Sequence, residues 1–184
     1  MIRRQLLRGR ARWQKPERVL RAAGVRRGNV VADVGAGPGF FTLPLARRVG
    51  GRGHVFAVDP EPAALEVLRR RLVAAGVRNV TPVLGDDGAP MLPEAGCDVA
   101  VMVNVYHHFA APAAFLKRVV RCLKPGGRLV NIDWADRDTP KGPAANRRIP
   151  PAVFLRHARA AGLTPVATHD FLPYQYFFVL RRRR

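Results

Sequence analysis

Residues Val30 to Ala46 read VVADVGAGPGFFTLPLA, and this stretch decides the fold. An apolar run that contains Asp33 is followed by three glycines within five residues, and a second apolar run begins at Phe40. Glycine allows the backbone to approach a ligand closely, and a helix after such a loop presents free N–H groups and the positive end of its dipole. The stretch therefore predicts a buried strand, a ligand-binding glycine loop and a helix.

The rest of the chain repeats this alternation of strand and helix. Apolar segments predict further strands at 54–59, 79–86, 97–105, 128–134, 163–171 and 174–180. Prolines near their starts and glycines near their ends predict helices at 16–24, 60–76, 111–127 and 150–162, of which the third closes with a Pro-Gly-Gly turn. Such alternation predicts an α/β fold with a doubly wound parallel sheet. Ligands of these sheets bind outside the carboxyl ends of the strands.

The composition is that of one folded domain. The 184 residues are 48% hydrophobic, and no apolar run approaches the roughly 20 residues that span a bilayer. The first ten residues, MIRRQLLRGR, lack the apolar segment of a secretory signal, so we expect a cytoplasmic protein. The cysteines and histidines show no metal-ligand spacing, and we expect no metal site. We divide the chain into a basic arm at 1–14, one domain at 15–180 and a basic tail at 181–184.

The net charge of +19 raises nucleic acid or an anionic surface as a partner. An alternative is base composition of the genome, because 28 of the 32 basic residues are arginine. Ten basic residues lie in the first 27 positions, where Trp13 is the only aromatic side chain that could stack on a base. We expect RNA to bind weakly, through its phosphates and without sequence preference.

The spacing of the glycines separates two kinds of ligand. A dinucleotide-binding loop has the pattern G-x-G-x-x-G, which would place the third glycine at position 40, where this chain has Phe. The third glycine is Gly39, and no Gly-Lys-Ser/Thr follows that would make a phosphate-binding P-loop. Neither a dinucleotide nor a nucleoside triphosphate fits this pattern.

Five segments, in order and spacing, resemble the class I S-adenosylmethionine-dependent methyltransferases, and the branch with the ubiquinone/menaquinone-pathway C-methyltransferases is the most similar. They are VADVGAGPGFFT, VFAVDPEPAALE, VLGDD, CDVAVMVNVYHHF and LKPGGRLVNIDW. The resemblance covers about residues 15–180. It implies a Rossmann-like, seven-stranded, mostly parallel sheet with one antiparallel strand near the C-terminus. It also implies S-adenosyl-L-methionine as cofactor.

The resemblance assigns cofactor contacts at three strand ends. The loop through Gly35, Ala36, Gly37 and Gly39 would approach the methionine part, and Asp33 would orient its amino group. Asp59, followed by Pro60, would accept hydrogen bonds from the ribose hydroxyls, with Glu61 as a rival and a helix N-cap as its alternative role. The adenine amino group would meet Asp86 or Asp87, between which the sequence does not choose. Asn104 would also contact the cofactor.

The acceptor would lie over the ends of the fourth and fifth strands. Asn104, His107 and His108 follow the fourth strand, and Asp133 and Trp134 end the fifth. A histidine there could remove a proton from the acceptor, since its pKa is close to working pH; the alternative is that one histidine caps a helix and the other is solvated. The helix with Trp13 and the loop 135–149 are the candidate lids.

We therefore expect a methyltransferase that acts on a small molecule. One rival is an RNA methyltransferase, which the net charge favours; the missing Pro-Pro-aromatic motif after Asn104 counts against methylation of a base amine. The other rival is a non-catalytic basic binding module that retains the fold. The intact glycine loop and strand-end acids count against it.

Overall fold

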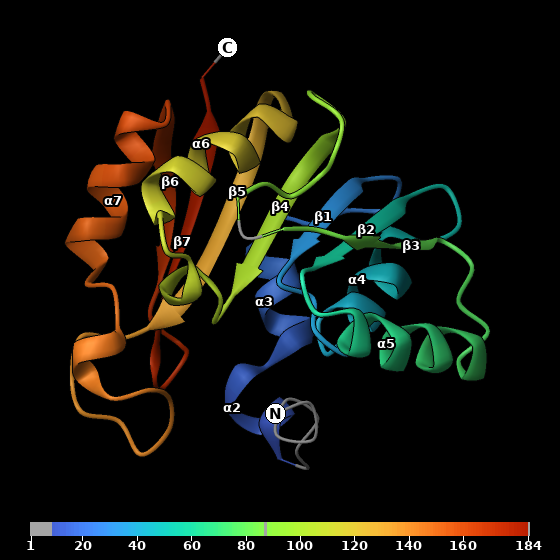
Figure 1. Cartoon of the computed structure of the whole chain (residues 1–184), viewed down its shortest axis with the longest axis horizontal. Coiled ribbons are helices and arrows are strands. Elements are labelled where there is room, and N and C mark those ends of the chain that lie inside the picture. Colours follow the sequence, from blue (N-terminus) through green and yellow to red (C-terminus); the bar gives the residue numbers. More distant parts are fainter. Residues whose placement is uncertain (1–8, 87, 184) are drawn as a thin grey trace.

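A seven-stranded sheet forms the centre of the molecule (Figure 1). The computed structural model describes residues 9–86 and 88–183. The strand order is β3-β2-β1-β4-β5-β7-β6, and β7 runs antiparallel to both of its neighbours while the other strands pair in parallel. The strands are β1 (Val30–Val34), β2 (His54–Asp59), β3 (Val80–Leu84), β4 (Cys97–Val103), β5 (Leu123–Trp134), β6 (Leu163–His169) and β7 (Gln175–Arg182). This arrangement confirms the expected fold class.

The helices lie where the sequence predicts them, and one more precedes them. They are α2 (Arg10–Gln14), α3 (Pro16–Ala22), α4 (Thr42–Val49), α5 (Pro62–Ala74), α6 (Pro112–Cys122) and α7 (Pro151–Ala160). Two short 3₁₀ turns, η1 (Tyr106–His108) and η2 (Ala145–Arg147), follow β4 and precede α7. Within the described ranges, no helix has the length and apolar character needed to cross a membrane.

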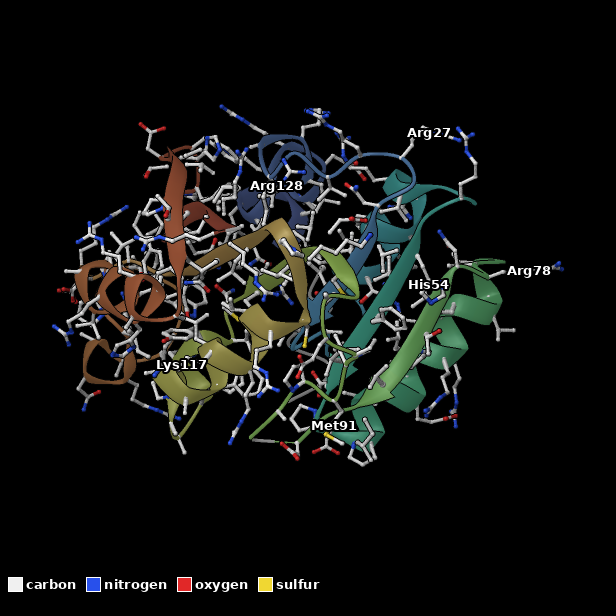
Figure 2. All side chains as sticks on the ribbon, turned by 90° about the horizontal axis from the view of Figure 1, so that it is seen from above. Arg27, His54, Arg78, Met91, Lys117 and Arg128 are labelled. Carbon is white, nitrogen blue, oxygen red and sulfur yellow. The ribbon has the colours of Figure 1, made fainter. Side chains whose placement is uncertain are left out.

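Basic side chains are spread over the surface rather than confined to the ends of the chain. Figure 2 shows Arg27, Arg78 and Lys117 projecting outward from three separate segments. The expected basic arm at 1–14 is helical from Arg10 onward, and residues 1–8 lie outside the described part. The expected tail at 181–184 overlaps β7, which extends through Arg182.

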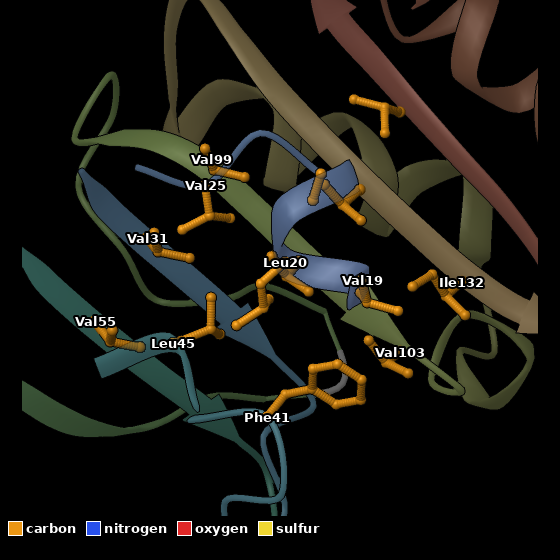
Figure 3. Close-up of a cluster of buried hydrophobic side chains, with 14 of the residues drawn as sticks. Val19, Leu20, Val25, Val31, Phe41, Leu45, Val55, Val99, Val103 and Ile132 are labelled. Carbon is orange, nitrogen blue, oxygen red and sulfur yellow. The ribbon is translucent and has the colours of Figure 1, made fainter. Parts of the chain in front are cut away.

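The two faces of the sheet are covered by different helices, as the doubly wound topology requires. On one face, α3 and α4 pack their apolar residues onto Val31, Val55 and Val99 (Figure 3). The same face continues over α5, where Leu68 packs near Ala57. On the other face, α6 and α7 cover the alternate residues of β1, β4 and β5. Because the strands are apolar on both faces, the sheet is buried except at its ends and edges.

One predicted turn proves to be part of a strand. Helix α6 ends at Cys122, and the segment Lys124–Gly127 lies within β5 rather than closing the helix. Strand β5 pairs Leu123 with Cys97 and then Arg128 with Val99, so its four intervening residues bulge out opposite one residue of β4. The sequence pattern misled because proline and glycine are typical both of turns and of irregular sheet edges.

The topology brings the ends of β1 and β4 together at the point where the strand order reverses. Strand β1 pairs with β2 on one side and β4 on the other, and the two crossover connections leave in opposite directions. A crevice forms at such a switch point outside the carboxyl ends of the strands. The glycine loop, the end of β2 and the histidine turn η1 all lie at this end of the sheet.

The close approach of Val105, which follows β4, to the glycine loop predicts a stability effect. Gly35 has φ +75°, and a methyl group added there would lie 2.4 Å from Val105 Cγ2. We expect Gly35→Ala to lower the free energy of unfolding by about 2–4 kcal/mol, from the left-handed backbone and the overpacking together. Gly28→Ala is the matched control, because Gly28 has φ +82° with no atom within 4 Å of the added methyl. It should cost about 1 kcal/mol. Equal losses in urea denaturation would contradict the packing argument.

Candidate active site

The glycine loop joins the ends of β1 and β2. Backbone amides of Gly35 and Ala36 both donate to the Val58 carbonyl, at 2.8 and 3.0 Å. Gly35, Gly37 and Gly39 all have positive φ, between 53° and 85°, which side chains other than glycine rarely adopt. The loop is therefore a tight turn whose conformation requires its glycines.

Asp59 ties the end of β2 to this loop. Its Oδ2 accepts a hydrogen bond from the Gly37 amide at 2.7 Å, and its Oδ1 accepts from the Glu61 amide at 3.0 Å. The side chain is buried, which raises its pKa, while these two backbone hydrogen bonds lower it. The N-cap of α5 is Glu61, whose Oε1 accepts from the Ala63 amide at 3.2 Å. Asp59 is therefore not the helix N-cap, and exposed Glu61 is engaged in capping.

Asp33 is a second buried carboxylate beside the loop. Its Oδ2 accepts a 2.6 Å hydrogen bond from the Thr42 hydroxyl in the first turn of α4. Burial, together with the nearby charge of Asp59, raises the pKa of Asp33 to about 7, against the lowering effects of the Thr42 hydrogen bond and the charge of Arg10. A cation bound here would favour the ionised form of Asp33.

Arg10 brings a positive charge to the same end of the sheet, in a segment that the sequence pattern indicates to be an arm. Its guanidinium lies over the ring of Phe40, 4.2 Å from the centroid, and its Nε donates to Gln14. Burial lowers its pKa to about 10, and the charge of Asp33 opposes this. The only sequence signal for Arg10 is its density of neighbouring arginines, which does not single out one position.

The acids after β3 occupy a different environment. Asp86 is exposed, and its Oδ1 accepts a 2.6 Å hydrogen bond from the Gly88 amide within its own turn. Asp87 lies outside the described residues. The Gly85 amide donates to the Asp59 carbonyl at 3.2 Å, which places this turn beside the end of β2. Pro60 is exposed next to Asp59.

Asn104 leaves β4 in a strained conformation. Its φ is 57°, in the left-handed region that asparagine tolerates better than most residues. Its backbone amide donates to the Ile132 carbonyl at 2.8 Å, and its Oδ1 accepts from Gln175 Nε2 at 2.5 Å. Gln175 is buried and its Oε1 has no partner among the described residues. The partner in β7, far away in sequence, was not foreseeable from a local motif.

His107 and Asp133 form a buried pair across the ends of β4 and β5. Asp133 Oδ1 lies 2.8 Å from His107 Nδ1, and its Oδ2 accepts from the His107 backbone amide at 3.1 Å. The two side chains are 4% and 1% exposed. With Asp133 Oδ1 accepting a hydrogen bond from Nδ1–H, the free lone pair of the neutral ring is on Nε2. The pair therefore holds a histidine whose remaining nitrogen can accept a proton.

His108 is placed differently, although it is the next residue. It is exposed, and its ring centroid lies 4.0 Å from that of His107. Burial of part of the ring lowers the pKa of His108, and the neighbouring His107 lowers it further. The structure thus separates two histidines that the sequence treats alike.

Three aromatic side chains meet at the end of β5. Trp13 lies 5.7 Å from Trp134 and 5.6 Å from Tyr174, measured between ring centroids. The loop 135–149 folds over Trp134, where a methyl group on Gly142 would lie 2.7 Å from the indole ring. Arg148 fastens this loop by donating to the carbonyls of Ala135 and Pro143. The helix with Trp13 and the loop 135–149, which are the two candidate lids in the sequence, therefore both contact Trp134.

The site as a whole has two parts. The loop glycines, Asp33 and Asp59 gather at the ends of β1 and β2, and Asn104, His107 and Asp133 gather at the ends of β4 and β5. No three His, Cys, Asp or Glu side chains of the described ranges are placed to hold a metal ion. The arrangement offers buried acceptors on one side and a potential base on the other.

Comparison with known proteins now identifies the family. Residues 31–127 match the methyltransferase domain family, and the chain belongs to that family. The ubiquinone/menaquinone biosynthesis C-methyltransferase of Azotobacter vinelandii is 36% identical over 114 residues, which are 61% of this chain and 45% of that protein. The chain thus spans about half the length of the curated relatives it matches. The resemblance found in the sequence motifs is confirmed.

Solved structures agree on the fold. A SAM-dependent methyltransferase from Aquifex aeolicus superposes with a TM-score of 0.93 at 26% identity, over 98% of this chain and 96% of that one. The 1,6-didemethyltoxoflavin-N1-methyltransferase of Burkholderia thailandensis was solved with bound 1,6-didemethyltoxoflavin and S-adenosylhomocysteine. It superposes with a TM-score of 0.75 at 24% identity, over 96% of this chain and 80% of that one. The second likeness shows the fold alone.

The raised pKa of Asp33 predicts how stability depends on pH. The folded chain keeps this proton to about pH 7, whereas an unfolded chain releases it near pH 4. Folding therefore binds a proton between these values, and stability falls as pH rises from about 4 to about 7. Asp33→Asn removes this fall. The free energy of unfolding of the variant, minus that of the parent, should therefore be roughly 2–4 kcal/mol greater at pH 7 than at pH 4. Parallel stability curves from urea denaturation at several pH values would contradict the assignment.

Proposed function

We propose that this protein transfers the methyl group of S-adenosyl-L-methionine to a small-molecule acceptor. The observation that carries the proposal is the pairing of the Gly37 amide with the Asp59 carboxylate at the switch point of the sheet. This bond holds a flexible loop and a strand-end carboxylate in one fixed arrangement. Membership of the methyltransferase domain family supports the same reading.

The residues at the ends of β1 and β2 fit the cofactor. When bound, S-adenosylmethionine supplies an electrophilic methyl group on a positively charged sulfur. Asp33 is a buried carboxylate whose pKa is raised to about 7, mainly by burial, and the amino group of the methionine part would add a positive charge beside it. Arg10 would bind the carboxylate of the same part. Asp59 retains lone pairs on both oxygens for the ribose hydroxyls.

The acceptor would lie between the aromatic wall and the histidine turn. Trp13, Trp134 and Tyr174 would contact a flat molecule, and a relative of this chain is named as a C-methyltransferase of ubiquinone/menaquinone biosynthesis. Asn104 would contact both cofactor and acceptor, because it follows β4, the strand that pairs with β1 and its glycine loop. For this chain, we propose only the class of acceptor, a flat small molecule.

Within this arrangement, His107 is the proposed general base. Its Nδ1 is held by Asp133, so Nε2 would accept the proton that an acceptor hydroxyl, amine or activated carbon gives up during transfer. Asp133 acts through His107 as a positioning residue, since it fixes both the ring and the backbone of the turn. The ring of His108 lies beside that of His107, with 4.0 Å between the ring centroids.

Cofactor binding tests the first half of the proposal. Isothermal titration should detect binding of S-adenosylmethionine and S-adenosylhomocysteine, and no binding of NAD. Asp59→Ala should weaken binding by about 1–3 kcal/mol, because two hydrogen bonds to a charged group are lost. Glu61→Ala is the matched control and should leave the affinity unchanged, since Glu61 caps α5. Arg10→Gln should lower the affinity for S-adenosylmethionine by at least about tenfold, because a charge-assisted hydrogen bond to the carboxylate would be lost. Loss of affinity in the Glu61 variant alone would move the ribose contact to that residue.

The histidine assignment gives a separate kinetic prediction. His107→Gln should lower kcat about 10²–10⁴-fold with the cofactor affinity intact, whereas His108→Gln should retain most of the activity. Asp133→Asn should lower kcat and change the pH profile, because the ring loses the carboxylate that orients it. The assay follows labelled methyl groups from S-adenosylmethionine into a fractionated metabolite extract. Full turnover of the His107 variant would show that the acceptor needs no base.

The same assay separates the rival reading, in which RNA is the acceptor. A parallel reaction with total RNA at physiological salt should incorporate no site-selective label. Site-selective label in one RNA species would contradict the small-molecule proposal and identify RNA as the acceptor. The expected weak binding of RNA and the expected cytoplasmic location stay predictions.

A further inference from the structure

Two hollows lie at the end of the sheet opposite to the proposed active site. One has a volume of about 500 Å³ and is lined by Thr164, Val166 and the run Arg181–Arg183. The other, about 330 Å³, is lined by Arg26, Asp98, Lys124, Arg128 and Arg181. The bulge Pro125–Gly126 and Arg181 border both hollows, so the two are neighbours. Sites for small molecules have volumes of this size.

A like-charged pair lies at the centre of this surface. In the register of β5 and β7, Arg128 lies directly opposite Arg181. Like charges opposite each other on neighbouring strands destabilise a sheet. Arg26, Arg128 and Arg181 line one hollow together. Burial lowers the pKa of Arg128, and the charges of Arg26 and Arg181 lower it further, against the opposing charge of Asp98. The arrangement costs stability in the absence of an anion.

The available acid does not neutralise this charge. Asp98 is the one carboxylate among the described lining residues, and its Oδ1 accepts from Lys124 Nζ at 2.7 Å. Its Oδ2 accepts from the Val30 amide at 2.8 Å. Asp98 therefore already accepts a hydrogen bond on each oxygen, and its single negative charge stands against four basic side chains in the second hollow.

The arginines of this surface differ in what holds them. Arg128 Nη2 donates to the Gly24 carbonyl at 2.7 Å, and Arg182 donates to carbonyls at the end of α6. By contrast, no hydrogen bond or ion pair of the described chain involves the Arg26 or Arg181 side chain. Arg128 is thus fixed as the base of the surface, with two unpaired guanidinium groups beside it.

We propose that Arg26, Arg128 and Arg181 form a binding site for a small phosphate-bearing anion with at least two negative charges. Guanidinium groups bind phosphate oxygens through paired, charge-assisted hydrogen bonds. An anion between Arg128 and Arg181 would turn their repulsion into attraction to a shared partner. The site is separate from the methyl-transfer site, because it lies at the amino ends of β4 and β5.

A small ligand fits this surface better than a nucleic acid strand does. Binding of single strands uses aromatic side chains on which bases stack, and none of the residues that line the two hollows is aromatic. The unpaired guanidinium groups are also gathered around one point instead of following a groove. Phosphate recognition without base recognition is the chemistry that remains.

The test uses the full chain with pyrophosphate as the probe. Isothermal titration at low salt should show saturable binding that weakens as salt rises. The variant Arg26→Gln/Arg181→Gln should lose at least about tenfold in affinity, since each charge-assisted hydrogen bond is worth roughly that factor. The matched control is Arg52→Gln/Arg78→Gln, which removes two exposed arginines outside both hollows. The control should bind pyrophosphate like the parent, and both double variants should keep the parent's circular dichroism spectrum.

Three results would overturn the proposal. One is the absence of saturable pyrophosphate binding to the parent chain. Another is an equal loss of affinity in both double variants, which would show a diffuse effect of net charge. The third is tighter binding of a single-stranded oligonucleotide than of pyrophosphate, with affinity that grows with strand length, which would identify the surface as a nucleic-acid interface.

Discussion

The structure of the site depends on one hydrogen bond, from the Gly37 amide to the carboxylate of Asp59. Glycine is the most flexible residue, and three glycines within five positions would leave the loop with many conformations. Asp59 removes that freedom from one side, and the Val58 carbonyl, which accepts from Gly35 and Ala36, removes it from the other. Parallel pairing of β1 and β2 places Val58 and Asp59, at the end of β2, beside the loop that follows β1. The strand order therefore determines which residues hold the loop.

The charge of this site runs against the charge of the chain. The protein carries a net charge of +19, yet Asp33 and Asp59 are buried side by side at the switch point. Burial raises the pKa of each, because a carboxylate loses hydration there and has few donors in exchange. A ligand with a positive sulfur and an ammonium group matches such a place. At the other end of the sheet, by contrast, Arg128 and Arg181 lie opposite one another on neighbouring strands.

The two ends of the sheet thus have opposite chemistry. At the carboxyl ends, acidic groups, a histidine held by Asp133 and an aromatic wall surround the proposed reaction. At the amino ends of β4 and β5, unpaired guanidinium groups surround two shallow hollows. The strands between them are apolar on both faces, and the buried core isolates the charges at one end from those at the other.

By itself, the sequence determined the fold class, the family and the strand-end acids, because these are encoded by local patterns: apolar runs, glycine spacing and residues a fixed distance after a strand. Tertiary structure alone decided the rest. Asp33 meets Thr42 and Arg10, Asn104 meets Gln175, and His107 rather than His108 meets Asp133, in pairs that are brought together by strand order. His107 and His108 are adjacent in the sequence, yet only the side chain of His107 is directed at Asp133. The hydrophobic pattern of the sequence does not distinguish them. The segment 10–14 read as an arm for the same reason: its helix is held by contacts of Trp13 with Trp134 and Tyr174, which lie more than a hundred residues away in the chain.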